Sequence, residues 1–486
     1  MKKQFLLICS IIIGLNSYPQ VSDWNNGGGN SERNGLAFVN GPDKDSILWQ
    51  ATPEGMFGMP VYIEGNKLVT MRFLGMENAP IVCYDLNTGE LLWQKEITDL
   101  TGRSLPIGFR DGQVYAMRLT ESLNDSLYAL NAEDGSKVWT SDITIDTYIT
   151  VSANFDVNGD LFVESFSSDP QSYKMNKINH LTGELIWGTN IMPILVGGSE
   201  LTIYGNIGYY IGQTGGIVKV FAMDLETGLI RYSHPLTYTH GTAIPECPVM
   251  VGPDGTIYAH VQSDNITALV DNGDSLSVLW ITDIYGNAPF SHMCIGSDGS
   301  VYAPSDGKII RLNPATGEIL NTSPTVCSNP DLFMFRAAAS QNGIIYATNG
   351  ESGIYAFTLD LKEIWSDYVP NVNTSGAVIG SNGLVAVAGT DIIKVYVPSL
   401  SVSINDLKPE APIVFYPNPV KDYLQVQIQQ KQIGPDYYIA DQTGRIVLKG
   451  RLINEFNTLD LTSLGKGCYF LTIGSNKGSN YKLIKQ

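Results

Sequence analysis

The chain has 486 residues, of which 43% are hydrophobic and 16% are charged; this composition supplies a large core and excludes an intrinsically disordered protein. The net charge of −18 would repel nucleic-acid phosphates, so we expect no nucleic-acid partner. The charge is uneven, because residues 413–486 carry nine Lys/Arg and five Asp/Glu while the residues before them are strongly acidic. This contrast favours a domain boundary near residue 400.

The N-terminal residues are typical of a signal peptide. Two lysines at positions 2 and 3 precede an apolar run over residues 5–15. This run is shorter than the roughly 20 residues that span a bilayer. We therefore predict a signal peptide over residues 1–20, cleaved between residues 17 and 22. No other apolar run is long enough for a membrane helix, so we expect no transmembrane segment.

The cysteines do not follow the spacing of a disulfide framework or of a zinc site. Five lie outside the predicted signal peptide, and no Cys-x-x-Cys occurs. We expect buried thiols, with one disulfide as the alternative. The five are Cys83, Cys247, Cys294, Cys327 and Cys468.

A repeated motif dominates the chain. In this motif an Asp or Asn is followed four residues later by a Gly, and the Gly is followed four residues later by an aromatic residue. Residues 83–93 and 177–187 are two examples. The short polar side chain and the Gly are typical of a tight turn, and the aromatic side chain would pack between neighbouring repeats. The spacing near 45 residues is typical of one four-stranded propeller blade. The aromatic docking positions are Trp49, Trp93, Trp139, Trp187, Tyr232, Trp280 and Trp365.

A second motif, Asp-Gly or Asn-Gly between alternating apolar residues, precedes the first by about 20 residues and predicts a β-hairpin. We count eight copies, ending with residues 381–386, after which no Trp strand follows. Trp49 lies in phase with the other tryptophans but has no preceding copy. We therefore predict an all-β, eight-bladed propeller in which the strand around Trp49 completes the last blade. Seven blades is the alternative, if a weak copy within 201–211 or 309–320 is misassigned.

These residues resemble the PQQ-repeat family, which includes quinoprotein alcohol dehydrogenases and a lipoprotein of the outer-membrane barrel-assembly machinery. Residues 83–93, 129–139, 177–187 and 222–232 match its Ala-x-Asp-x-x-Thr-Gly-x-x-x-Trp motif, and Trp24, Gly29, Arg33 and Gly35 resemble its lead-in. The resemblance implies a propeller domain over residues 21–398. Many members of the family bind no quinone.

The sequence departs from the quinoprotein dehydrogenases, which carry adjacent cysteines, a Ca²⁺ site and long blade insertions. No two cysteines are adjacent here, and the repeats leave little room for insertions. We expect a non-catalytic binding or scaffold module without catalytic residues, PQQ or Ca²⁺, whose ligand is an unidentified protein or glycan. The alternatives are a PQQ-dependent dehydrogenase and a glycan-binding module, with Phe57, Tyr148, Phe290 and Phe335 as candidate aromatic contacts.

Four basic residues are candidate ligands at one mouth of the central channel, where propellers usually bind ligands. They are Arg103, His240, His292 and Arg336, each near the predicted start of an innermost strand. Such a group could hold an anion or a quinone; polar groups satisfied within loops are the alternative. Asp156, Asn158 and Asp160 have the alternating oxygens of a Ca²⁺ loop, but they also occupy a hairpin position.

The C-terminal part begins after a predicted linker over residues 399–412. Alternating strands and turns over residues 413–486 predict a small Ig-like β-sandwich. Its motifs resemble the type A sorting domain of the type IX secretion system: Pro417, Asn418 and Pro419, then Gly444, then Gly467 and Tyr469. The resemblance implies a partner in that secretion machinery, a Bacteroidetes-type bacterium, removal of the domain, and a final location outside the cell or on the outer-membrane surface.

Overall fold

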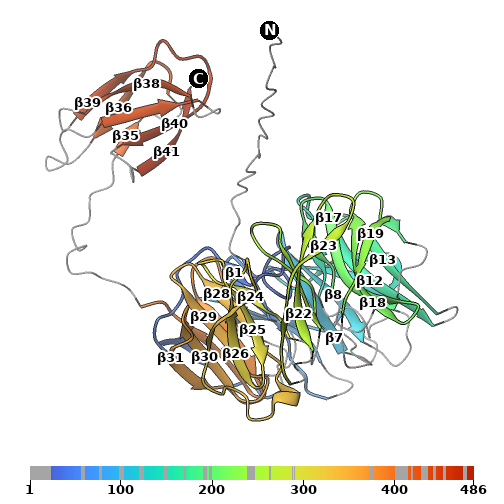
Figure 1. The fold of residues 1–486 in the computed structure, drawn as a ribbon. Coiled ribbons are helices and arrows are strands. Elements are labelled where there is room, and N and C mark those ends of the chain that lie inside the picture. Colours follow the sequence, from blue (N-terminus) through green and yellow to red (C-terminus); the bar gives the residue numbers. More distant parts are fainter. Residues whose placement is uncertain are drawn as a thin grey trace, which may run out of the picture. The chain divides into compact units, whose positions relative to one another are not determined.

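The chain forms two compact units in the computed structural model, Met1–Ser399 and Leu400–Gln486 (Figure 1). The structure describes residues 23–399 and 414–485 apart from several gaps. The gaps are residues 56–60, 76–78, 98–102, 120–124, 146–151, 169–170, 190–193, 196–199, 238–246, 262–263, 287, 289–290, 373–375, 417–419, 428–435, 442–444, 453–455 and 474–478. The predicted signal peptide and, Ser399 apart, the predicted linker lie outside the described residues.

The architecture is all-β, which confirms the predicted fold class. Apart from the short 3-10 helix η1 (Pro330–Leu332), every helix or strand of the described residues is a strand. Over those residues, no helix has the length and apolar character needed to cross a membrane.

The described part of the first unit contains eight sheets of four or five strands. Four successive sheets are β3 (Tyr62–Glu64), β4 (Lys67–Met71), β5 (Ile81–Asp85) and β6 (Leu91–Lys95); β7 (Arg103–Arg110), β8 (Gln113–Leu119), β9 (Asp125–Asn131) and β10 (Lys137–Ile145); β11 (Asn154–Phe155), β12 (Leu161–Ser168), β13 (Gln171–Ile178) and β14 (Leu185–Gly188); and β15 (Ile194–Leu195), β16 (Thr202–Tyr204), β17 (Ile207–Thr214), β18 (Ile217–Asp224) and β19 (Ile230–Pro235).

The remaining sheets continue the same order and then take in two strands from the start of the chain. They are β20 (Met250–Val251), β21 (Ile257–Val261), β22 (Asn265–Asp271) and β23 (Leu276–Asp283); β24 (Cys294–Ile295), β25 (Val301–Ser305), β26 (Lys308–Leu312) and β27 (Ile319–Thr322); β28 (Arg336–Ser340), β29 (Ile344–Thr348), β30 (Gly353–Thr358) and β31 (Glu363–Tyr368) with β1 (Leu36–Ala37); and β32 (Val378–Ile379), β33 (Val385–Gly389) and β34 (Ile392–Tyr396) with β2 (Ile47–Ala51).

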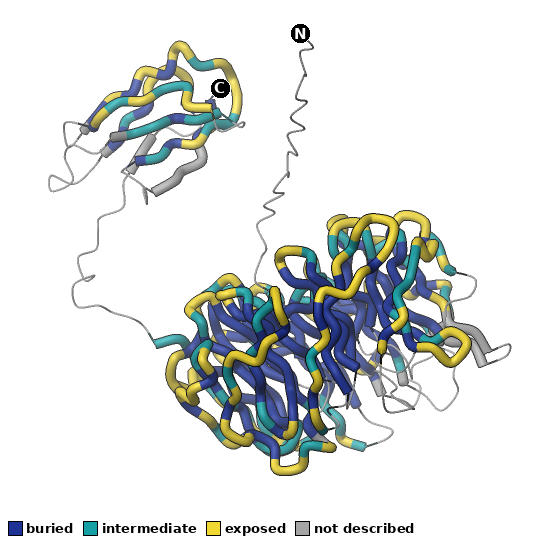
Figure 2. Tube along the Cα trace, viewed as in Figure 1, coloured by how far each residue is buried: buried dark blue, intermediate teal, exposed yellow. Residues whose placement is uncertain are grey.

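A short inner strand at the start of one sheet contacts its counterpart in a neighbouring sheet, as β3 contacts β7, β11 contacts β16, β16 contacts β20, and β24 contacts β28. The contact between β3 and β32 joins the first and last sheets of the series. The outer strands carry exposed residues around a single buried aromatic position, as in β6, whereas the inner strands are buried throughout (Figure 2). β2 pairs antiparallel with β34, as the phase of Trp49 predicts, so the N-terminal strand completes the last sheet.

The repeated turn forms as its chemistry requires. The Asp85 carboxylate accepts hydrogen bonds from the backbone N–H groups of Asn87 and Thr88, and Gly89 adopts a φ of 76°. A positive φ is accessible to Gly without a Cβ clash. This turn therefore fixes the register between the third and fourth strands of the sheet.

The second unit has two sheets. One has the order β35–β36–β39, and the other has the order β38–β37–β40–β41. Buried Leu, Val and Ile side chains from both sheets, such as Leu424 and Leu471, form one shared core. The strands are β35 (Val414–Tyr416), β36 (Tyr423–Gln427), β37 (Asp436–Ala440), β38 (Ile446–Arg451), β39 (Phe456–Asp460), β40 (Gly467–Ile473) and β41 (Ser479–Lys485).

Candidate functional site

The docking tryptophans join neighbouring sheets. Each indole N–H donates to a backbone carbonyl of the next sheet, and five indole rings lie against the Gly of that sheet's turn, leaving no room for a Cβ there. The hydrogen bonds run from Trp49 to Leu86, Trp93 to Ala132, Trp139 to His180, Trp187 to Leu225, Trp280 to Pro314 and Trp365 to Pro42. These side chains are committed to structure, because each both buries its ring and uses its single donor.

Two of the outer strands have another residue where the other sheets have a docking Trp. The contacts with the next sheet differ between these two places. At one of them stands Asn321, and there the Arg311 guanidinium bridges Asp298 of its own sheet and Asp360 of the next. At the other stands Tyr232, whose hydroxyl donates to the Asp271 carboxylate of the next sheet. No atom lies within 4 Å of a Cβ built on Gly273, the turn glycine beside Tyr232.

The segment Trp24–Ala37, which precedes the repeats, runs along the innermost strands. It bonds in chain order to seven of the eight sheets, and its carbonyls accept from backbone N–H groups that the sheets leave unpaired at their inner edges. The contacts are Trp24 with Ile63, Asn25 with Phe109, Asn26 with Asn154, Ser31 with Ile203, Glu32 with Val251, Asn34 with Ile295 and Gly35 with Ala339. The segment therefore lines one end of the central channel.

Arg33 is the basic residue of the segment Trp24–Ala37, and its side chain lies in the channel. Its guanidinium forms an ion pair with Glu200 at 2.5 Å, and both side chains are almost completely buried. It also donates to the Gly27, Leu201, Ser152 and Ala153 carbonyls. The backbone of Arg33 has a φ of 49°, an uncommon value for a non-glycine residue, so its surroundings hold it in a strained conformation.

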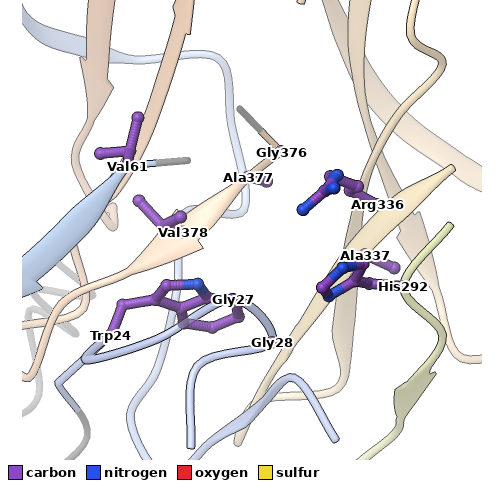
Figure 3. A pocket seen from close by; sticks show the side chains of 10 residues that line it. All are labelled: Trp24, Gly27, Gly28, Val61, His292, Arg336, Ala337, Gly376, Ala377 and Val378. Carbon is purple, nitrogen blue, oxygen red and sulfur yellow. The ribbon is translucent and has the colours of Figure 1, made fainter. Parts of the chain in front are cut away.

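A cavity lies beside this ion pair, with about 300 Å³ of empty space, part of it open to solvent. In Figure 3 the side chains of His292 and Arg336 lie on one side of it, and Trp24, Val61 and Val378 lie on the other. Gly27, Gly28 and Gly376 also line it, so much of its wall is backbone. His292 and Arg336 come from neighbouring sheets and form a parallel β-bridge, which fixes their spacing.

The polar groups of this cavity are buried and incompletely bonded. Arg336 is 7% exposed and His292 is 6% exposed, and no protein atom bonds the Nε of Arg336 or the Nδ1 of His292. Burial, with the Arg336 and Arg33 charges, holds the pKa of His292 well below its usual range, so the ring is neutral at pH 7. Burial also lowers the pKa of Arg336, but a guanidinium stays protonated.

The acids near the channel do not neutralise Arg336 by direct contact. Glu200 pairs with Arg33, and burial raises the pKa of Glu200 while the two arginines lower it. Burial and the Glu200 charge raise the pKa of Glu164 well above its usual value, which favours its neutral form. Among the described residues, Arg336 is thus a buried cation that faces a cavity and has no carboxylate in salt-bridge contact.

Of the other predicted channel residues, only the backbone of Arg103 is described. Arg103 begins β7 and pairs in register with Leu119, whereas Arg336 pairs with Thr348, closer to its hairpin turn. The Arg103 side chain and all of His240 lie outside the described residues. Among the candidate aromatic contacts, Phe335 is fully buried, and its ring lies edge-on to that of Phe333 with 5.6 Å between the ring centres. Phe57, Tyr148 and Phe290 lie outside the described residues.

The candidate Ca²⁺ oxygens are engaged by the protein. The Asp156 carboxylate accepts from the backbone N–H groups of Asn158 and Asp160 and pairs with Lys177 at 2.7 Å. The Asp160 carboxylate lies 3.2 Å from the Nδ1 of His180. These contacts are those of a hairpin turn. Over the described residues, no cluster of three or more His, Cys, Asp or Glu could hold a metal ion.

Part of the predicted sorting motif falls within the described residues. Gly467 begins β40, and the Tyr469 hydroxyl of the same strand donates to the Gly465 carbonyl at 2.9 Å. Pro417, Asn418, Pro419 and Gly444 lie outside the described residues.

Two protein families match the chain. The family described as outer membrane protein assembly factor BamB matches residues 39–202 and 77–323, which together are more than half of the chain. The secretion system C-terminal sorting domain matches residues 414–486. This domain marks proteins that the type IX secretion system exports to the cell surface or the extracellular space, which confirms the predicted export route.

Solved structures show the propeller fold at low sequence identity. BamB from Moraxella catarrhalis is 13% identical with a TM-score of 0.54, covering 72% of this chain and 99% of its own. The quinohemoprotein alcohol dehydrogenase from Comamonas testosteroni is 11% identical with a TM-score of 0.59, covering 77% of this chain and 80% of its own. The computationally designed Ika8 protein is 16% identical with a TM-score of 0.51, covering 75% and 99%. No curated protein sequence matches the chain.

Proposed function

We propose that this chain, which belongs to the family of the outer membrane protein assembly factor BamB, is an exported, non-catalytic binding module that takes a small anion in its central channel. The anion is an oxyanion or carboxylate, held by Arg336 and His292. One observation carries this proposal: a buried guanidinium faces a cavity with its Nε unpaired. A buried cation without a bonded acceptor is unfavourable, and an anionic ligand would supply the missing acceptor.

The neutral state of His292 supports an anion with hydrogen-bond donors as well as acceptors. A neutral imidazole has one donor and one acceptor nitrogen, and the Nδ1 of His292 has no hydrogen-bond partner among the described residues. Hydrogen phosphate has both kinds of group near neutral pH, and the tautomer with its proton on Nδ1 can also donate to an anion that only accepts, such as sulfate or selenate. The glycine-rich wall formed by Gly27 and Gly28 allows such a ligand to approach the backbone closely.

The described residues fit PQQ with Ca²⁺ poorly. Calcium takes six to eight oxygen ligands, but the described lining of the cavity holds no carboxylate, and Glu200 is already paired with Arg33. No catalytic step through PQQ is therefore derived, and dehydrogenase activity is an outcome that the experiment below would detect.

We also propose a blade number for the first unit and a fold type for the second. We assign the eight sheets to eight blades, supported by the pairing of β2 with β34 and by the contact between β3 and β32. We assign the two sheets and shared core of the second unit to an Ig-like β-sandwich, which would engage the secretion machinery.

The test is a calorimetric titration of the exported protein with phosphate, sulfate, citrate and PQQ, the last with Ca²⁺, together with a dye-linked assay of alcohol oxidation. We expect saturable binding of at least one of the first three anions and no turnover. His292→Gln should weaken this binding about tenfold, because it exchanges the imidazole for an amide of different reach, and His234→Gln should not, since His234 lies outside the cavity. Turnover with PQQ would overturn the non-catalytic assignment, and binding unaffected by His292→Gln would overturn the site.

A further inference from the structure

The one aromatic docking position occupied by Tyr instead of Trp coincides with a groove between two sheets. The groove is lined by residues of β16, β17 and β19 on one side and of the β20–β21 hairpin, β22 and the turn after β22 on the other. It has about 770 Å³ of empty space, including space open to solvent. Its aromatic side chains are Tyr204, Tyr209 and Tyr232, and its charged side chains are Arg231, Asp254 and Asp271.

The interface beside Tyr232 is packed differently from one with a docking Trp. A Cβ on Gly228, the turn glycine that faces Trp187, would lie 2.7 Å from that ring, whereas a Cβ on Gly273, in the turn between β22 and β23 (Leu276–Asp283), would meet nothing within 4 Å. Tyr232 contacts this turn through its hydroxyl, which donates to Asp271. The other interface without a docking Trp, at Asn321, is bridged by Arg311. The space beside Tyr232 is therefore a specific departure from the repeat.

The polar groups in the groove are fixed in place. The Asp271 carboxylate accepts from the hydroxyls of Tyr209 and Tyr232 at 2.5 and 2.6 Å, and also from the N–H of Gly273 at 2.7 Å. Burial and this carboxylate raise the pKa of both tyrosines, so both hydroxyls remain donors. The result is a rigid array of aromatic rings and oxygen acceptors, which needs little ordering on binding.

The groove carries more negative than positive charge. Arg231 pairs with Asp224, whereas the two carboxylates of the groove accept bonds from neutral donors, Asp254 from Thr256 and Asp271 from the two tyrosines. These carboxylates would repel an anionic ligand, and they keep acceptor positions for hydroxyl donors. A ring with an apolar face and hydroxyl groups at its edge matches the tyrosine rings and the remaining acceptor sites.

We propose that this groove is a binding site for a neutral carbohydrate, with the partly exposed rings of Tyr204 and Tyr232 contacting a sugar face and Asp254, Asp271 and Arg231 bonding its hydroxyls. The site is distinct from the channel cavity, with which it shares no lining residue. The two assignments can therefore fail independently.

The test uses the full exported protein and neutral hexasaccharides of glucose, mannose, galactose and N-acetylglucosamine, titrated by calorimetry. We expect at least one to bind saturably. Tyr232→Trp restores the docking residue of the repeat, so its indole should fill the groove and weaken binding at least tenfold without lowering the unfolding midpoint. Tyr285→Trp is the matched control, because Tyr285 is 69% exposed and lies outside the groove; its affinity should equal that of the wild type.

A second variant, Tyr204→Ala, tests the site independently if Tyr232→Trp fails to fold. Tyr204→Ala removes a partly exposed ring at the edge of the groove and should also weaken binding at least tenfold. Phosphate binding in the channel should be the same in all three variants, which separates this site from the first proposal. The carbohydrate site would be overturned by binding of none of the hexasaccharides, by equal affinity in Tyr232→Trp and wild type, or by binding of tetramethylammonium in their place.

Discussion

Arg33 and Glu200 form a buried ion pair between the N-terminal segment and the residue that precedes the fourth sheet's inner strand, with a nitrogen and an oxygen 2.5 Å apart. The pair joins residues 167 positions apart in the chain. It ties the segment that lines the channel end to the wall of the channel, and it leaves Arg336 as the buried cation facing the cavity.

Breaking this pair from one side should destabilise the propeller. Arg33→Met leaves Glu200 buried without its partner, which costs about 3–5 kcal/mol in the free energy of unfolding. Urea unfolding followed by tryptophan fluorescence measures this change. The double variant Arg33→Met/Glu200→Met should recover most of the loss, because neither charge is then left buried; additive losses in the double variant would contradict a direct pair.

Two turn glycines should respond differently to the same substitution. Gly183 and Gly273 have φ values of 76° and 90°, so Ala at either position costs about 1–2 kcal/mol of backbone strain. A Cβ on Gly183 would also lie 2.5 Å from the Trp139 ring, whereas one on Gly273 meets nothing within 4 Å. We expect Gly183→Ala to lower the free energy of unfolding by at least about 1 kcal/mol more than Gly273→Ala. Equal losses would show that the interface beside Tyr232 is as closely packed as the others.

Buried histidines should make the propeller sensitive to mild acid. Burial lowers the pKa of His260 to about 4, and no protein atom bonds either of its ring nitrogens. The unfolded chain takes up a proton near pH 6.5 and the folded chain does not, so stability falls as the pH falls from about 6.5 to 4. A shift of this size corresponds to roughly 3 kcal/mol.

The variant His260→Leu should remove about half of the pH dependence that the two histidines cause, because His292, whose pKa is also lowered, contributes a similar part. Urea midpoints measured at pH 7 and pH 5 for wild type and variant check this expectation. If both proteins lost the same stability between the two pH values, His260 would not be the responsible group.

The two units should be separable. The contact pattern divides the chain between Ser399 and Leu400, and the sorting domain has its own core around Leu424 and Leu471. A chain ending at Ser399 should therefore unfold at the same urea concentration as the propeller of the full protein, yet remain inside the cell envelope. Cell fractionation with antibodies to the propeller tests this. Export of the shortened chain would show that residues 414–486 are not its signal.

The local part of the fold is predictable from the sequence because its causes are local. The Asp85-to-Gly89 turn and the position of Trp93 follow from side-chain hydrogen bonding, positive φ and a fixed spacing. Likewise, the phase of Trp49 predicts the pairing of β2 with β34. These features repeat, so each copy supports the interpretation of the others.

The site at the channel cavity depends on contacts between residues outside the repeated motifs, so the sequence repeat does not predict them. Arg33 meets Ser152 and Leu201 only through the path of the Trp24–Ala37 segment, and its partner Glu200 stands in no motif. His292, Arg336 and Arg103 are all predictable as residues near the starts of inner strands, although the register of Arg103 in β7 differs from that of Arg336 in β28. The groove at Tyr232 could have been suspected from a single signal, the Tyr in a Trp position.

The central claim, an anion held by Arg336 and His292, is tested most directly by diffraction from a crystal of the propeller soaked in selenate. Selenium gives an anomalous peak that locates the anion without reference to the rest of the density. The account predicts a peak in the cavity with selenate oxygens within 3.2 Å of the Arg336 Nε and near the His292 Nδ1. A cavity that holds only water at saturating selenate, while both side chains keep their positions, would contradict it.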